Sequence, residues 1–232
     1  MRQLMPDLFL IEGLQGANVY LLTSRDELTL VDSGTREDVE KISAQIKEAG
    51  FSLEDLAILL LTHGHGDHMG GAGEIVRRSG ARVIAHQAEV DYIEGRAGLP
   101  SPSFIQRLMF WLSDHLVMPR EPCPVDHPVK DGEQIQILGG MQIIHTPGHT
   151  QGSISLYHPQ KKILLCGDAL FNQNPLNGNP GLRLPLRMVT LDNQLAYQSA
   201  VKITQLDVEL LCPGHGEPIQ EETNRKIASL LS

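Results

Sequence analysis

The sequence lacks an apolar run of the roughly 18 residues that a membrane-spanning helix requires. Its N-terminal stretch, MRQLMPDLFLIEG, is interrupted by Pro6, Asp7 and Glu12 before an apolar signal-peptide core can form, so we expect no secretory signal. Basic residues are also scarce, since 19 lysines and arginines face 28 acidic residues and give a formal net charge of −9. This charge opposes nucleic-acid binding, and we expect neither a nucleic acid nor a membrane as partner.

Cysteine is rare as well, with three residues in the chain, Cys123, Cys166 and Cys212. Three cysteines do not make the disulfide framework of a small secreted protein. Cys166 and Cys212 end the apolar runs ILLC and ELLC, which favours buried thiols over a catalytic or metal-binding role. A reducing, cytoplasmic location fits this composition best.

The 232 residues, 41% hydrophobic and 20% charged, are typical of a soluble globular protein. In the first half, segments in which apolar and polar residues alternate predict strands. A helix is expected at 35–50, since Thr35 and Asp38 form a capping box and Val39, Ile42 and Ile46 form one apolar stripe. The strands are expected at 7–13, 18–24, 28–34, 55–63 and 81–87, with a second helix at 72–80.

The second half repeats this scheme. Two hairpins are predicted. The first joins segments 134–138 and 141–149 through Gly139-Gly140, and the second joins segments 153–158 and 161–168. A helix at 191–204, a strand at 208–215 and a closing helix at 221–231 follow. Strands followed by helices in both halves predict an α/β fold in which two sheets pack together with helices outside. We expect a single domain over 1–232, with a helical insertion at about 92–128.

Metal-ligand residues follow the apolar strands of both halves. The segment LTHGHGDHMGG crowds three histidines and an aspartate between glycines, and later strands lead to further histidines and an aspartate. The rigid ends of strands hold ligands well, while the loops beyond them leave room for a substrate. The seven candidate ligands are His63, His65, Asp67, His68, His149, Asp168 and His215.

Seven ligands suit a pair of metal ions that share a carboxylate. His63 and His65 point to the same side of an extended segment and can bind one ion with His149. After a turn that the glycines allow, Asp67 and His68 can bind the second ion with His215, and Asp168 is the natural bridge. The other histidines lack such a setting and are expected to be structural or solvated: His86, His115, His127, His145 and His158.

The motifs THGHGDHMGG, TPGHTQGS, CGDALF and PGHG, in this order, resemble those of the metallo-β-lactamase-fold hydrolases. The resemblance runs from residue 28 to His215 and implies an αββα sandwich with a dinuclear metal site at one edge. It implies the ligand sets given above, and it matches Asp32 to an aspartate under the site that orders the ligand loop. A simple turn or cap role for Asp32 is the alternative.

The closest resemblance is to glyoxalase-II-like and lactonase-like members. However, only 17 residues follow His215, where hydroxyacylglutathione hydrolases continue into a helical domain, and Phe171 stands close to where acyl-homoserine lactonases carry a tyrosine. The expected function is therefore hydrolysis of a small ester, thioester or lactone by a hydroxide that bridges the two metals, with Asp67 orienting the hydroxide or taking its proton. Zinc is the expected metal, with iron or manganese as alternatives.

Other functions stay open. One is a mononuclear iron enzyme like the persulfide dioxygenases, because histidine and carboxylate ligands accept iron as well as zinc. Another is an intracellular β-lactamase-like amide hydrolase. A metal-stabilised binding module without catalysis is disfavoured because every candidate ligand is present.

Two segments could contact a substrate. The stretch 104–117 is too apolar to stay exposed and holds Phe110 and the one tryptophan, Trp111; it is expected to be a lid over the metals, part of the core, or the contact of a homodimer. The stretch 174–189 is expected to be a loop, and Phe171, which precedes it, is a further candidate substrate contact. Arg183 and Arg187 of this stretch either recognise a carboxylate or phosphate or are solvated.

Overall fold

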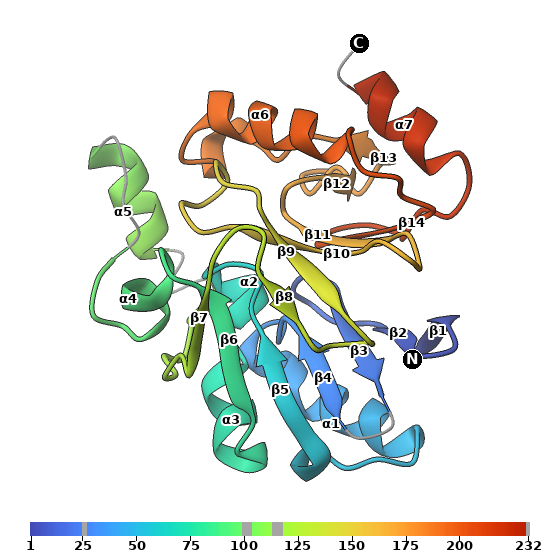
Figure 1. Cartoon of the computed structure of the whole chain (residues 1–232). Helices are drawn as coiled ribbons and strands as arrows, with labels where there is room; N and C mark the ends of the chain where they lie inside the picture. The colour runs from blue at the N-terminus through green and yellow to red at the C-terminus, as the bar shows by residue number, and fades with distance from the viewer. Residues whose placement is uncertain (25–26, 99–103, 113–117, 231–232) are drawn as a thin grey trace. The chain divides into compact units, whose positions relative to one another are not determined.

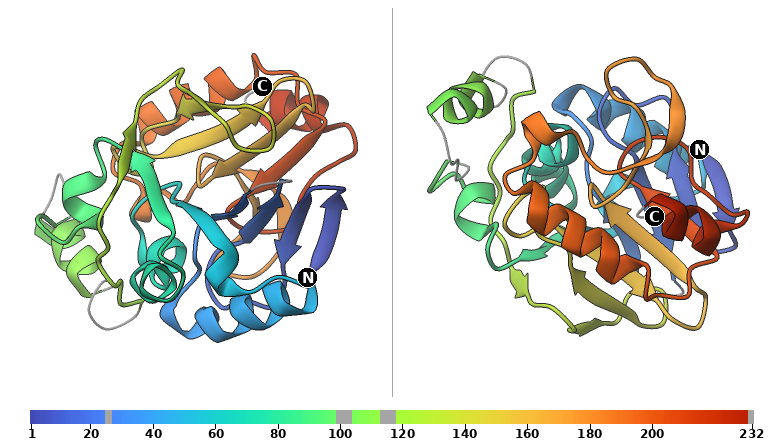
Figure 2. Two further views of the ribbon diagram at one scale, coloured as in Figure 1. Left: turned by 60° about the horizontal axis from the view of Figure 1, so that its bottom comes forward. Right: turned by 90° about the horizontal axis from the view of Figure 1, so that it is seen from above.

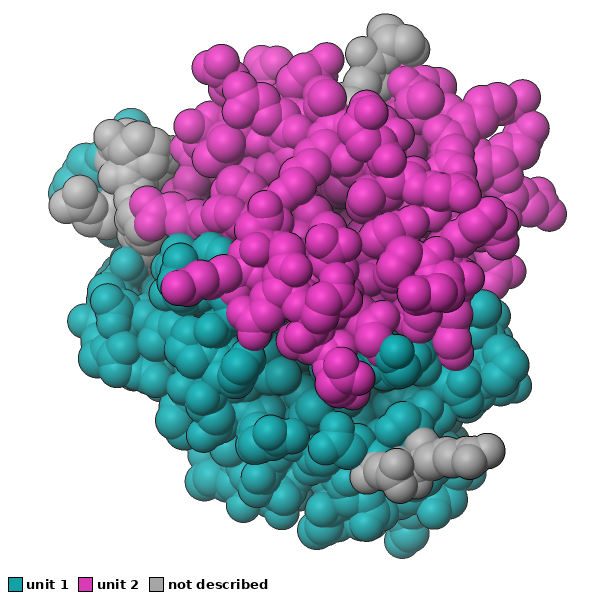
Figure 3. Space-filling model, in the orientation of Figure 1, with its two compact units in different colours: residues 1–129, 137–139 teal, residues 130–136, 140–232 magenta. Residues whose placement is uncertain are grey.

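A computed structural model describes the chain except for residues 25–26, 99–103, 113–117 and 231–232, and except for the side chains of residues 106, 107, 109 and 110. The chain divides into two compact units. Unit 1 contains residues 1–129 and 137–139, and unit 2 contains residues 130–136 and 140–232 (Figure 3).

Unit 1 is built on a seven-stranded mixed sheet in the order β1-β2-β3-β4-β5-β6-β7 (Figure 1). Neighbouring strands from β1 to β4 are antiparallel, and those from β4 to β7 are parallel. The strands are β1 (Arg2–Met5), β2 (Leu8–Ile11), β3 (Val19–Thr23), β4 (Leu28–Val31), β5 (Leu56–Leu60), β6 (Arg82–His86) and β7 (His127–Val129).

α-Helices and two 3-10 turns complete the described part of unit 1. Helix α1 begins after the predicted capping box of Thr35 and Asp38, which is present. Its stripe of Val39, Ile42 and Ile46 packs with Ile75 and alternate strand residues in one core cluster, so α1 and α3 cover the same face of the sheet (Figure 2). These elements are η1 (Arg36–Asp38), α1 (Val39–Glu48), η2 (Leu53–Asp55), α2 (Gly66–Met69), α3 (Ala72–Ser79), α4 (Val90–Ile93) and α5 (Phe104–Leu112).

Unit 2 is built on a five-stranded mixed sheet in the order β14-β11-β10-β9-β8. Both predicted hairpins form, since β9 pairs antiparallel with β8 and β10 pairs antiparallel with β11. The elements are β8 (Gln134–Ile135), β9 (Met141–His145), β10 (Ile154–His158), β11 (Ile163–Gly167), β12 (Phe171–Gln173), β13 (Pro180–Arg183), η4 (Arg187–Val189), α6 (Asn193–Ile203), β14 (Leu210–Pro213) and α7 (Thr223–Leu230).

The core of unit 2 joins its two helices to one face of its sheet. Ala200 and Ile203 of α6 and Ile227 of α7 pack in one cluster with strand residues such as Leu164 and Leu211. Both units therefore consist of a mixed sheet covered by helices, and the predicted α/β class is confirmed.

Two sequence-based expectations about individual segments need correction. The stretch 174–189 was expected to be a loop, but Pro180–Arg183 forms strand β13, which pairs antiparallel with β12. Core packing was one interpretation of the apolar stretch 104–117, yet Phe104 and Ile105 of α5 are 77% and 70% exposed. Residues 113–117 of that stretch lie outside the described residues. The lid and dimer interpretations of α5 stay predictions.

None of the helices among the described residues is long and apolar enough to cross a membrane.

All three thiols are buried, as predicted from the apolar runs that two of them end. Cys123 belongs to the core cluster of unit 1, so this part of the predicted insertion packs into that unit. Burial raises the pKa of the Cys123 thiol from 9.0 to about 12, and the nearby carboxylates of Asp126 and Glu121 add to this rise.

We expect the native protein to react very slowly with an aromatic disulfide reagent at pH 8. Burial blocks access of the reagent, and the raised pKa of the Cys123 thiol lowers the fraction of thiolate, which is the reactive form. The absorbance of the released thiol measures the reaction, and the denatured chain, with all three thiols exposed, is the control. Rapid reaction of one thiol in the native protein would contradict this burial.

Candidate metal centre

In unit 1, the candidate ligands lie on the loop and short helix that follow β5. The apolar run of β5 continues through the buried Leu61 and Thr62, and His63 comes next. His65 precedes helix α2, which carries Asp67 and His68. The sequence thus places four ligand side chains within residues 63–68, directly after a buried parallel strand, as predicted.

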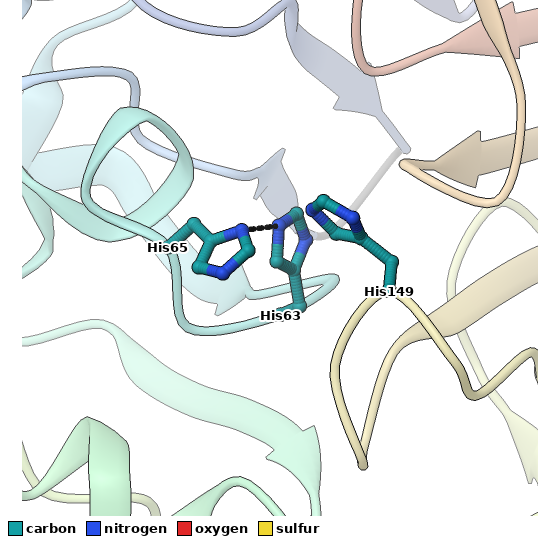
Figure 4. Close-up of side chains that lie close together, drawn as sticks. All are labelled: His63, His65 and His149. Atoms are coloured by element: carbon teal, nitrogen blue, oxygen red, sulfur yellow. Dashed lines mark hydrogen bonds between the residues drawn. The ribbon is translucent and has the colours of Figure 1, made fainter. Parts of the chain in front are cut away.

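His63 and His65 turn ring nitrogens toward each other. Nε2 of His63 lies 3.1 Å from Nδ1 of His65 (Figure 4). Two imidazole nitrogens that share one tetrahedral zinc at about 2.0–2.1 Å each are separated by roughly 3.3 Å. The observed separation therefore fits two ligands of one ion. Thr62 holds the other nitrogen of His63, because its Oγ1 lies 3.2 Å from Nδ1.

Asp32, the residue that directly follows β4, orients the ring of His68. Oδ2 of Asp32 lies 2.8 Å from Nδ1 of His68, and both side chains are buried. The Asp32 carboxylate also accepts hydrogen bonds from the backbone N–H and the hydroxyl of Thr62. A carboxylate at Nδ1 fixes the tautomer that presents Nε2 to a metal. The position of Asp67 agrees with a metal on Nε2 of His68, since Oδ2 of Asp67 lies 4.0 Å from that nitrogen.

Sequence reasoning missed two residues that shape the backbone of this loop. The N–H of Gly64 donates a hydrogen bond of 3.0 Å to Oε2 of Glu89, a carboxylate that is 2% exposed. A Cβ on Gly64 would lie 2.3 Å from the ring of Tyr92, so a side chain does not fit between His63 and His65. Neither Glu89 nor Tyr92 lies in a recognisable motif, and only the fold brings them to this loop.

In unit 2, three candidate ligands come from separate strands. His149 follows β9 and the Thr146-Pro147-Gly148 turn, Asp168 follows β11, and His215 follows β14. One carboxylate oxygen, Oδ2 of Asp168, lies 3.2 Å from Nε2 of His149 and 3.5 Å from Nε2 of His215. Asp168 and His149 are buried. The arrangement fits a carboxylate that bridges two ions, each held by one of the histidines.

Two further side chains contact the histidines of unit 2. Phe171 packs its ring against both imidazoles, with centroid distances of 4.8 Å to His215 and 6.2 Å to His149. Oγ1 of Thr190 lies 3.4 Å from Nδ1 of His149 and donates to the carbonyl of Leu186. The sequence indicated Phe171 through its place in CGDALF, whereas Thr190 carried no signal.

The histidines interpreted as structural make local hydrogen bonds. Nδ1 of His86 accepts from the N–H of Ala88, Nδ1 of His158 accepts from the N–H of Lys161, and Nε2 of His145 lies 2.9 Å from the carbonyl of Gln151. Among the described residues, none of these belongs to a group of metal-ligating side chains. His115 lies outside the described residues.

The predicted substrate contacts differ in their surroundings. The side chain of Phe110 lies outside the described residues, while Trp111 on α5 is 52% exposed. Phe171 is 2% exposed, Arg183 is half-buried and Arg187 is exposed. Arg187 lines a cavity of about 360 Å³ with residues of α6, including Tyr197. Contact of these residues with a substrate stays a prediction.

We expect Asp32→Asn to lower the affinity for one metal ion by about 10- to 100-fold. Asparagine tolerates the left-handed backbone of residue 32, where φ is +63°. Its oxygen can still accept from Thr62, but its NH2 group would then face His68 Nδ1 and favour the tautomer with a proton on Nε2. Competition with a chromophoric chelator measures the affinity, with Asp55→Asn in the exposed turn η2 as control. Unchanged affinity would contradict the positioning role of Asp32.

Comparison with known proteins gives a consistent set of relatives. A model of the metallo-beta-lactamase superfamily matches residues 13–215. The probable metallo-hydrolase YflN of Bacillus subtilis is 30% identical and the match covers 90% of this chain and 84% of that protein. The hydroxyacylglutathione hydrolase of Pseudomonas aeruginosa is 32% identical over 64% of this chain and 44% of that protein.

Solved structures are similar over most of the chain. The metallo-beta-lactamase family protein TTHA1429 of Thermus thermophilus has a TM-score of 0.73 and 26% identity, and the match covers 99% of this chain and 79% of that one. A metallo-beta-lactamase with a HARLDQ motif from Cronobacter sakazakii has a TM-score of 0.69 and 26% identity, with coverages of 91% and 76%. The family match contains all seven candidate ligands.

Proposed function

The chain belongs to the metallo-β-lactamase superfamily and is a metallo-hydrolase of that family with a candidate His/Asp metal cluster. We propose that it is a hydrolase that uses two metal ions. The substrate class that we propose is a small ester, thioester or lactone. The family match and the similar structures confirm the predicted metallo-β-lactamase fold. The observation that carries the dinuclear proposal is the single oxygen of Asp168 placed close to both His149 and His215.

The ligand sets that we propose are those that the sequence predicts. His63 and His65 would hold one ion with His149, and Asp67 and His68 would hold the other with His215. Asp168 would bridge them. The donor set of imidazoles and carboxylates suits zinc, which we propose as the native metal, and also accepts iron or manganese.

Bound divalent ions lower the pKa of a coordinated water toward neutrality and polarise a carbonyl oxygen. The residues of this chain then have two tasks. His68 keeps its tautomer through Asp32, and His63 keeps its orientation through Thr62. Asp67, whose side chain is 19% exposed, can accept the proton of an attacking water, because its carboxylate lies beside the ligand His68 and still reaches solvent.

The relatives support different acyl substrates. The similarity to a hydroxyacylglutathione hydrolase, which covers 64% of this chain, supports a thioester. The similarity to a metallo-β-lactamase from Cronobacter sakazakii supports an amide as second candidate. All these reactions begin with attack of water on a carbonyl, so the same ligand geometry serves each of them. A small molecule is the proposed substrate, in line with the formal net charge of −9 that opposes nucleic-acid binding.

Elemental analysis of protein purified without added metal tests the dinuclear proposal. We expect two zinc or manganese ions per chain, together with turnover of simple esters or thioesters that ends when a chelator removes the metal. A single iron per chain, with oxygen consumption in place of hydrolysis, would contradict the proposal and favour the dioxygenase-like alternative.

A further inference from the structure

Arg183 ends strand β13, which forms a hairpin with β12 (Figure 1). It is directly opposite Phe171 in this antiparallel pair. Residues in such positions project to the same face, with Cβ atoms about 4.5–5.5 Å apart. The ring of Phe171 contacts His215 and His149, so Arg183 projects from the face that carries these ligands.

The neighbouring residues confirm this orientation. Leu182 and Leu184, on either side of Arg183, pack against the core cluster beneath α6 and α7. The pairing of β12 and β13 shifts by one residue between Phe171 and Gln173, but the direct pair of Phe171 and Arg183 is kept. Since neighbouring side chains alternate between the two faces of a strand, Arg183 is expected to point away from the core that Leu182 and Leu184 contact. Phe171, although buried, does not belong to this cluster. The hairpin therefore presents an apolar face to the core, and Phe171 and Arg183 share the opposite face, where Phe171 contacts the ligand histidines.

Arg183 is half-buried as a residue, and its guanidinium has no carboxylate partner among the described residues. Its one hydrogen bond there runs from Nε to the carbonyl of Gly181, at 3.2 Å. By contrast, Arg78, Arg96 and Arg225 form ion pairs with nearby carboxylates. Its two Nη groups thus remain as donors with the fork geometry that a carboxylate accepts in bidentate fashion.

We propose that Arg183 determines specificity by binding a carboxylate group carried by the substrate, so that the preferred substrates are ester or thioester acids. This inference rests on the proposed hydrolase function. A single guanidinium matches the one negative charge and the two oxygens of a carboxylate with two parallel hydrogen bonds, whereas a phosphate dianion carries a second charge that Arg183 alone does not balance. The chemistry therefore favours a carboxylate over a phosphate.

The test uses the metal-loaded enzyme and three aryl esters of equal acyl length, which end in a carboxylate, a neutral carboxamide or a phosphate. The parent protein is expected to prefer the carboxylate ester over the carboxamide at least tenfold in kcat/KM. Arg183→Gln should lower this ratio by about tenfold or more, to near one, because one charge-assisted pair is lost. Arg183→Lys should give an intermediate ratio, and added salt should weaken the preference of the parent.

Matched variants separate the outcomes. Arg225→Gln, on the exposed face of α7, should leave the ratio unchanged. If Arg187→Gln removes the preference and Arg183→Gln does not, the assignment to Arg183 is wrong. Hydrolysis of all three esters without a carboxylate preference, or with a phosphate preference, overturns this inference while the hydrolase function stands. A metal-loaded parent that hydrolyses none of them overturns both.

Discussion

Replacing Asp168 with alanine is expected to lower kcat/KM by about 1,000-fold, equivalent to about 4 kcal/mol, and to reduce the content of both metal ions. The reason is the position of Oδ2, within 3.5 Å of Nε2 on both His149 and His215. In the proposed dinuclear site, neither ion would keep a full set of ligands without this oxygen, and the two histidines would lose their common partner. Steady-state kinetics and elemental analysis on the same preparation measure the two effects.

Asp67→Ala is the informative comparison for this prediction. Asp67 is assigned to one ion, so its loss should lower the content of a single metal and damage activity less than the loss of Asp168. Asp207→Ala, at an exposed ion pair with Lys162, serves as the surface control. An Asp168 variant with two bound ions and near-normal turnover would show that the bridging assignment is wrong.

Gly148→Ala is expected to destabilise the protein more than Gly140→Ala, by about 1–3 kcal/mol in the free energy of unfolding. The two glycines share a left-handed backbone, with φ of +127° at Gly148 and +126° at Gly140, so the strain of adding a side chain is similar. They differ in the space around them. A Cβ on Gly148 would lie 2.1 Å from the backbone nitrogen of Ala196, whereas a Cβ on Gly140 would meet no atom within 4 Å.

The same substitution should also disturb catalysis, since Gly148 directly precedes His149. A displacement of about 1 Å at a positioned group costs on the order of 100-fold in rate. Urea unfolding gives the stability difference, and kcat/KM of the folded fraction gives the catalytic one. Equal stability of the two variants would indicate that α6 moves to accept the side chain at little cost.

The parts of the fold that sequence reasoning predicted are those with a regular pattern. The stripe of Val39, Ile42 and Ile46 predicted α1, and the continuous apolar run before His63 predicted β5. The glycine pair 139–140 predicted the hairpin of β8 and β9. At the candidate site, the sequence predicted that the ligands follow strands, and they follow β5, β9, β11 and β14. The short spacing of the ligands within residues 63–68 also predicted that these four side chains lie on one loop.

The missed features depend on contacts between distant segments. Glu89 meets Gly64 only because β6 pairs with β5, and a single glutamate in the sequence gives no sign of such a bond. Strand β13 was taken for a loop because its residues, Pro180 to Arg183, begin with proline and glycine and alternate poorly. Its pairing with β12 decides its structure, and no local pattern encodes that pairing.

The position of the one tryptophan has a practical consequence for fluorescence measurements. Trp111 lies on α5 of unit 1 and is 52% exposed, and the chain has no other indole. Intrinsic tryptophan emission therefore reports the surroundings of α5, while far-UV circular dichroism reports the helices and sheets of both units. If the two signals change at different urea concentrations, α5 loosens separately from the sheets, and unfolding is not a two-state process. A blue shift on addition of a substrate analogue would in turn show that α5 becomes covered when the site is filled.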